Sequence, residues 1–232
     1  MNSLNGSERL TGSVSKLRAH LNDWDPGEQL VAWNIQSWTQ RLGHLGEPVR
    51  SGLAVLDSEV ATSGGIRRSW VHDQRHMDPL SFLVIVMAWG FGRTGYGAER
   101  VRQMVESAHE HPTTLPRITD LAKSDAGEAY PGMFGPAGRA LIRQMGVAFG
   151  TKFLYFSGYR DNQTLKPLIY DRFVHTSLWA IPDRGFDLPR YTGGLRTRQY
   201  LSYLEFAQRL ASEQGIQSDW VERALFEGLD AQ

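Results

Sequence analysis

One uninterrupted apolar run constrains the fold of this 232-residue chain more than any other feature. Residues 80–89 read LSFLVIVMAW and follow Asp78-Pro79, a pair suited to the start of a helix. A helix that is apolar on every face must be enclosed by other elements, so the run predicts the central helix of a helical domain. The run is much shorter than a membrane span, which needs about 20 apolar residues.

Helical periodicity recurs along most of the chain, whereas alternating apolar and polar runs long enough for a sheet do not occur. The spacing predicts an all-α fold, with further helices over residues 7–24, 26–45, 47–61, 98–108, 115–122, 197–214 and 220–229. Residues 126–136 and 186–194 are expected to be irregular. The length, and an apolar fraction of 41%, suit one domain or two small lobes.

Composition limits the chemistry. The chain has no cysteine, which excludes disulfides and any cysteine-ligated zinc or iron–sulfur cluster. Its net charge is zero, but residues 139–198 hold ten Lys/Arg and four Asp/Glu, so this stretch carries +6. Such an excess is typical of nucleic-acid binding, although chance clustering gives the same pattern. The polar start MNSLNGSERL lacks the apolar core of a signal peptide, so a cytoplasmic location is expected.

Residues 141–179 contain the most informative pattern. Leu141, Ile142 and Met145 predict a helix that runs into a glycine-bearing turn, and a second helix follows with Lys152 in its first turn. Backbone N–H groups at such a turn favour an anion such as a phosphate. The helix dipole and burial would both disfavour the ammonium form of Lys152 and make it an amine nucleophile. The alternatives are a surface lysine and, for Asp171 further on, a simple helix cap.

This pattern resembles the helix-hairpin-helix DNA glycosylases, in particular their 8-oxoguanine DNA glycosylase branch. In that branch a Gly-Thr-Lys carries the catalytic lysine and an aspartate follows nineteen residues later, behind an apolar-Pro-apolar approach; here these are Gly150-Thr151-Lys152 and Asp171. The hairpin reads MGVAFG at residues 145–150, where the family usually has Leu-Pro-Gly-Val-Gly. The resemblance implies catalytic roles for Lys152 and Asp171. It also implies DNA-binding roles for Gly146, Gly150, Thr151, Arg93 and Arg172.

The end of the chain carries a second resemblance. Residues 220–226 read WVERALF, where the family has Trp-x-Gln-x-x-Leu-Phe. The resemblance makes Phe226 the residue that stacks on the flipped base, Phe156 the opposite wall and Glu222 the reader of the base edge. A carboxylate only accepts hydrogen bonds at neutral pH, so Glu222 favours a guanine-type base, 8-oxoguanine first. The alternatives are core packing for Phe226 and an exposed side chain for Glu222.

Two segments in the first half bear on DNA contact. The glycine-rich loop at residues 90–97 resembles the family loop that enters the duplex, which places Arg93 against the opposite base; a solvent-exposed loop arginine is the alternative. The family asparagine is replaced by Ala88-Trp89, so Trp89 or a loop aromatic could fill space in the stack instead. A basic-aromatic patch at residues 67–70 could touch DNA or be an exposed connection.

Taken together, the resemblance implies a two-lobed helical helix-hairpin-helix glycosylase-like fold without a β-domain. One domain is expected over residues 1–232, with the recognisable part at about 78–232 and extra N-terminal helices over 1–77. The implied function is a bifunctional DNA glycosylase and AP lyase of base excision repair that acts on double-stranded DNA with a flipped base. No metal or cofactor is expected, with a monovalent cation at the hairpin as the one candidate. The alternatives are a glycosylase acting on modified foreign (phage) DNA, a non-catalytic DNA-binding module, and a helical interaction protein that binds no nucleic acid.

Overall fold

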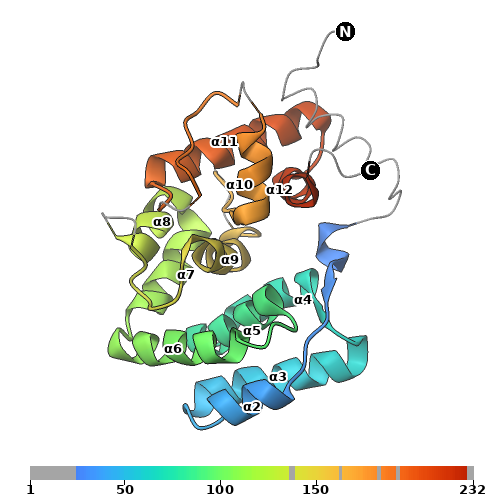
Figure 1. Cartoon of the computed structure of the whole chain (residues 1–232), viewed down its shortest axis with the longest axis vertical. Coiled ribbons are helices and arrows are strands. Elements are labelled where there is room, and N and C mark those ends of the chain that lie inside the picture. Colours follow the sequence, from blue (N-terminus) through green and yellow to red (C-terminus); the bar gives the residue numbers. More distant parts are fainter. Residues whose placement is uncertain (1–24, 136–138, 162–163, 182–183, 192–193, 229–232) are drawn as a thin grey trace.

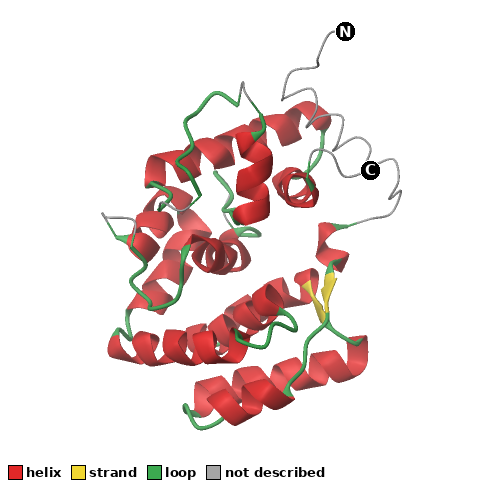
Figure 2. Ribbon diagram, viewed as in Figure 1, coloured by secondary structure: helices red, strands yellow, loops and turns green. Residues whose placement is uncertain are grey.

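The computed structural model describes residues 25–135, 139–161, 164–181, 184–191 and 194–228. Eleven α-helices make up most of this part, and its only strands are the two-residue antiparallel pair β1 (Leu30–Val31) and β2 (Ile66–Arg67) (Figures 1 and 2). The predicted all-α class is therefore confirmed. The helix predicted over residues 7–24 lies outside the described residues.

The helices form two groups that lie one above the other in Figure 1. The first group is α2 (Gln36–Leu42), α3 (Glu47–Ser63), α4 (Arg68–Asp73), α5 (Pro79–Phe91) and α6 (Gly97–Glu110), with the 3-10 turns η1 (Pro26–Glu28) and η2 (Gln74–His76). The second group is α7 (Thr114–Ser124), α8 (Ala126–Phe134), α9 (Val147–Gly158), α10 (Arg172–Trp179), α11 (Thr197–Gln214) and α12 (Ser218–Glu227). The two groups meet where α9 contacts α4 and α5.

Helix α5 is the central helix that its composition predicts. The Asp78 carboxylate caps it by accepting hydrogen bonds from the N–H groups of Leu80 (2.9 Å) and Ser81 (3.3 Å), and Pro79 occupies the first turn. Eleven of its thirteen residues are buried, because α3, α6 and α9 all pack against it. Helix α9 of the second group therefore packs directly against α5.

Two predicted elements differ from the structure. The helix predicted over residues 26–45 is instead η1, then β1, then α2, because residues 30 and 31 pair with β2 rather than with their own helical turn. The loop predicted over residues 126–136 contains α8. Asp125 starts α8 by accepting a hydrogen bond from Gly127 N (2.7 Å). Pro131 removes only one backbone donor, so burial of Tyr130, Met133 and their neighbours outweighs that loss.

The helix predicted around Leu141 is also absent from the structure. Residues 139–146 form an irregular connection between α8 and α9, and Gln144 adopts a left-handed conformation with φ 65°. The apolar pattern arises because Ile142 and Met145 are anchors of that connection and are fully buried in the core. The helices on either side of this connection are α8 and α9. No helix in the described part of the chain has the length and apolar character needed to span a membrane.

Candidate active site

Helix α9 begins at Val147 with Gly146 as its N-cap, so Lys152 lies in the second turn and not in the first turn as predicted. Gly150 is likewise within the helix rather than in the turn. A Cβ atom at Gly150 would collide with the Phe134 ring of α8, so this glycine permits close packing of α8 on α9. Buried inside a helix, Gly150 does not fit the predicted contact with a DNA phosphate.

Lys152 and Asp171 meet as the resemblance implies. The Lys152 ammonium nitrogen Nζ is 3.2 Å from Asp171 Oδ2, and each residue is only 8% exposed. The other carboxylate oxygen of Asp171 caps α10 by accepting hydrogen bonds from Phe173 N (3.0 Å) and Val174 N (3.3 Å). Asp171 is therefore both a helix cap and the partner of the lysine, and capping holds its free oxygen toward Lys152.

The segment that leads to Asp171 is held in place by hydroxyl groups. Thr151, next to the lysine, donates to Val147 O (2.8 Å) and accepts from Tyr170 N (3.0 Å), which ties the approach to α9. Tyr200 and Tyr203 of α11 donate to the carbonyls of residues 168 (2.8 Å) and 169 (3.0 Å). Because Thr151 is fully buried in this network, its side chain does not fit the predicted DNA contact. Its observed role is to position Asp171.

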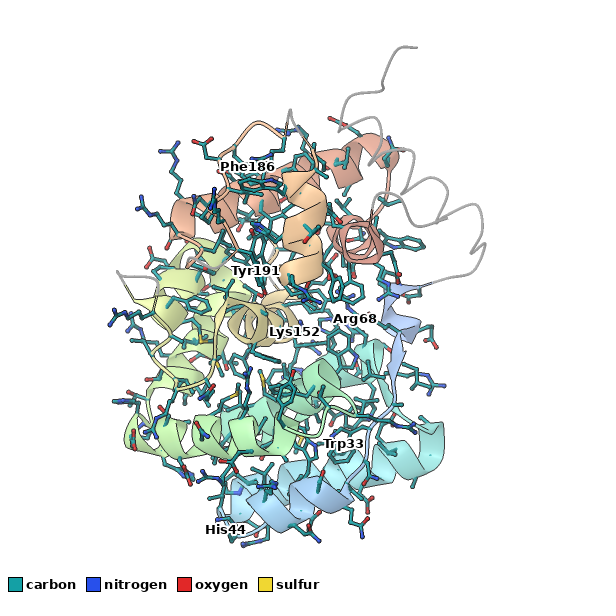
Figure 3. All side chains as sticks on the ribbon, viewed as in Figure 1. Trp33, His44, Arg68, Lys152, Phe186 and Tyr191 are labelled. Carbon is teal, nitrogen blue, oxygen red and sulfur yellow. The ribbon has the colours of Figure 1, made fainter. Side chains whose placement is uncertain are left out.

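The stem of Lys152 lies against α5, between the two groups of helices (Figure 3). A Cβ atom at Gly90 would be 3.1 Å from Lys152 Cδ, so the glycine leaves room for the lysine. The Phe149 ring centroid lies 5.9 Å from Nζ. The Lys152 side chain thus has apolar neighbours along its methylene groups and Asp171 as its charged partner. Once the Lys152 amine is deprotonated it is a nucleophile, with an acceptor beside it for the proton.

A second buried ion pair lies close to the first and joins α4 to α12. Arg68 and Glu222 are 1% and 2% exposed, and their side chains form a charge-assisted hydrogen bond. Arg68 Nε also donates to Tyr155 Oη (2.8 Å) of α9. Burial raises the pKa of Glu222 and Arg68 opposes this; burial lowers the pKa of Arg68, but Glu222, Tyr155 and Asp219 together outweigh it, so the net pKa of Arg68 is raised.

This pair changes the interpretation of both residues. The prediction of an exposed connection at residues 67–70 is wrong for Arg68, and the alternative of an exposed Glu222 is wrong as well. Base reading by Glu222 stays a prediction, and the structure adds that this carboxylate already has Arg68 as its partner. Nothing in the sequence indicates the pairing, because an arginine in an Arg-Arg-Ser-Trp run looks like a surface residue.

The two phenylalanines of the expected base pocket have different surroundings. The Phe156 ring is fully buried and contacts the rings of His72 (4.8 Å) and Trp89 (5.0 Å). Phe226 is half-buried and packs edge-to-face on Phe173 (5.1 Å). Among the described residues, the aromatic contacts of these two rings do not include each other. Because Phe156 is fully buried, a base could stack between the two rings only if the residues that cover Phe156 moved aside.

Three other predicted DNA contacts are accessible. Gly146 is exposed at the start of α9 and lines a hollow of about 540 Å³ that also includes Arg143. Arg172 is exposed at the start of α10, and its guanidinium lies 5.1 Å from the centroid of the Phe173 ring. Arg93 is exposed in the loop after α5. In the described part of the chain, no group of three or more His, Asp or Glu side chains is arranged to hold a metal ion.

In its described part the chain is an all-α protein in which a buried lysine of α9 meets the aspartate that caps α10, and this is the arrangement that the resemblance to helical DNA glycosylases implies. The family whose description reads "putative 8-oxoguanine DNA glycosylase OGG-like protein" matches residues 25–226, and the chain belongs to it. The match includes residues 25–77, which carry none of the motifs on which the resemblance rests. Comparison with curated proteins and with solved structures gives no match.

Proposed function

We propose that this protein is a bifunctional DNA glycosylase and AP lyase that acts in base excision repair. The observation that carries the proposal is the buried contact of 3.2 Å between Lys152 Nζ and Asp171 Oδ2. A protein that only binds DNA has no need to bury a lysine against a carboxylate at the junction of its lobes. Burial of two charges is costly unless the pair is used or tightly compensated.

The chemistry follows from the two groups. With the damaged nucleotide flipped out of the duplex, the neutral Lys152 amine attacks the anomeric carbon C1′ and the bond to the base breaks, so the base leaves with that electron pair. Asp171 stabilises the cationic sugar and takes the proton that the amine loses. Opening of the sugar ring gives a Schiff base on Lys152. Loss of a C2′ proton then expels the 3′ phosphate, and water releases Lys152.

We propose a guanine-type base as the substrate, 8-oxoguanine first. A guanine-type edge offers the donors N1–H and 2-amino next to the acceptor O6. The Glu222 carboxylate can accept from N1–H and the 2-amino group, and the Arg68 guanidinium can donate to O6. The two side chains lie together, so the pair matches the guanine edge. Within the described residues, the buried indole nitrogen Nε1 of Trp89 has no hydrogen-bond partner, and the Trp89 ring packs on Phe156. A base carbonyl would satisfy that donor.

We propose that DNA lies across the exposed positive groups. Gly146 at the start of α9 offers free N–H groups to a phosphate, and Arg172 and Arg93 flank the site on other elements. A monovalent cation at the hairpin remains our candidate for the only bound ion. We expect no organic cofactor, because the amine itself provides the covalent chemistry.

Borohydride trapping on duplex oligonucleotides tests the catalytic proposal. Wild type should form a covalent complex with an 8-oxoguanine duplex, and Lys152→Gln should abolish it while keeping DNA affinity. The matched control is Lys166→Gln, which removes another lysine of the same part of the chain and should trap normally. Undiminished trapping by Lys152→Gln would show that the nucleophile lies elsewhere.

The substrate proposal has its own test. Excision of 8-oxoguanine and of modified cytosines should be compared for wild type and Glu222→Gln. We expect wild type to prefer 8-oxoguanine and Glu222→Gln to lose part of that preference, because an amide, unlike a carboxylate, can also donate a hydrogen bond to the acceptor nitrogen of cytosine. Efficient release of a modified cytosine without activity on 8-oxoguanine would overturn the guanine assignment and leave the Schiff-base chemistry intact.

A further inference from the structure

A small hollow beside the candidate active site is lined by aromatic rings and an arginine. Its lining comes from two segments, with His175, Thr176 and Trp179 on α10 and Arg190 and Tyr191 on the segment that follows; its volume is about 230 Å³. Trp179 is 51% exposed and Tyr191 is 42% exposed, which is unusual for large aromatic side chains. Figure 3 shows Tyr191 next to α10, on the side toward Lys152.

The rings are arranged around His175. The His175 ring lies 5.8 Å from Trp179 in a stacked geometry and 5.2 Å from Tyr191 in a tilted one. Its Nδ1 is 2.7 Å from Tyr170 Oη, which orients the ring. Burial, with a contribution from Arg184, lowers the pKa of His175, so the ring is neutral near pH 7. The hollow therefore presents two exposed ring surfaces, those of Trp179 and Tyr191, on either side of the buried and neutral His175 ring.

The hollow adjoins the catalytic aspartate and the hairpin. His175, Arg190 and Tyr191 also line the larger hollow that reaches Gly146, so the two hollows are neighbours that share part of their walls. Tyr170, which directly precedes Asp171, lines the larger one. A DNA strand whose sugar lies at Lys152 and whose phosphate lies at Gly146 would pass this surface.

The charges around the rings select an anionic partner. Arg190 lies within the lining, Arg172 starts α10, and the Arg184 guanidinium lies 5.8 Å from the centroid of the Trp179 ring. Exposed rings with interspersed arginines match a nucleic-acid strand, because each base has a stacking face and each phosphate a negative charge. A base in a duplex is stacked on both sides and cannot enter, so the occupant must be unpaired.

We propose that this hollow binds a second, unpaired nucleobase of the strand that carries the damaged nucleotide. The proposal rests on the proposed function, since it requires DNA at the Lys152 site. It makes DNA with an unpaired nucleotide next to the lesion, as in a bulge or a gap, the preferred substrate class. Stacking supplies the affinity, so the site should accept any base.

The test measures binding by fluorescence anisotropy with labelled 8-oxoguanine duplexes, using Lys152→Gln protein so that no DNA is cleaved. One duplex is fully paired and the other has one bulged thymidine beside the lesion. Additional substitution Trp179→Ala or Tyr191→Ala should weaken binding to the bulged duplex roughly 5- to 100-fold, the range for loss of one stacked base, and should hardly affect the paired one. Tyr191→Phe keeps the ring and should bind like its parent.

The outcomes separate this proposal from the proposed function. Loss of affinity confined to the bulged duplex supports the hollow as a base site. Unchanged affinity, or an equal loss on both duplexes, overturns it even if wild type is trapped normally on 8-oxoguanine, and leaves the aromatic surface to a different partner. Failure of all proteins to bind either duplex would overturn both proposals at once.

Discussion

Substitution of Arg68 by methionine is the sharpest test of how this structure is held together. Methionine keeps most of the apolar stem and removes the guanidinium, so Glu222 is left 2% exposed without its ionic partner and Tyr155 loses a donor. Breaking a buried pair by removing one partner costs about 3–5 kcal/mol. Since domains of this kind are stable by only about 5–15 kcal/mol, Arg68→Met should lose a large part of the free energy of unfolding.

The double variant Arg68→Met, Glu222→Met removes both charges, whereas Arg68→Met alone leaves the Glu222 carboxylate buried and unpaired. Replacing both members of a buried pair by apolar groups is often neutral, so the double variant should be more stable than Arg68→Met alone. The surface control is Arg67→Met, whose partner Glu28 is 3.5 Å away with both side chains exposed. That control should cost at most about 1 kcal/mol.

Urea unfolding followed by far-UV circular dichroism measures all four proteins. Burial raises the pKa of Glu222, and without Arg68 the folded state should bind a proton there more readily than the unfolded state. The stability of Arg68→Met relative to wild type should therefore rise as the pH falls toward the unfolded-state pKa of a glutamate, about 4.3. A cost below about 1 kcal/mol for Arg68→Met, or a double variant no more stable than Arg68→Met, would refute the reasoning.

Three further predictions follow from the same structure. Asp171→Asn should reduce the single-turnover excision rate by about 10²–10³; asparagine keeps the cap of α10, but Tm should fall because Lys152 is left buried without its ionic partner, and a near-normal rate would reduce Asp171 to a helix cap. Burial lowers the pKa of His72, so acid favours the unfolded state, and stability should fall by up to about 2 kcal/mol between pH 7 and pH 5 in wild type but not in His72→Gln, as measured by urea titration at each pH. Gly158→Ala would bring a methyl group onto the carbonyl of Ala122 in α7 and should cost about 1–3 kcal/mol or more, whereas Gly95→Ala, with open space around it, should leave Tm unchanged.

The sequence by itself determined the elements that depend on local signals. Helix α5 follows from an aspartate–proline start and an all-round apolar run, and α11 begins and ends as its apolar spacing and Gly215 predict. The pairing of Lys152 with Asp171 is expected only from the resemblance of two short motifs and their separation to a family pattern, since the residues alone also fit a surface lysine and a simple helix cap. Local signals were enough for features whose residues lie close together along the chain.

Only the tertiary structure decided what happens between distant segments. Arg68 and Glu222 are 154 residues apart, and each looks like an ordinary surface charge until α4 and α12 are packed together. Gly150 looks like part of a phosphate-binding turn, yet α8 makes it a packing position. The aromatic hollow likewise forms only where the segment carrying Tyr191 folds back onto α10. Such contacts depend on which faces the fold brings together, and sequence spacing carries no information about that.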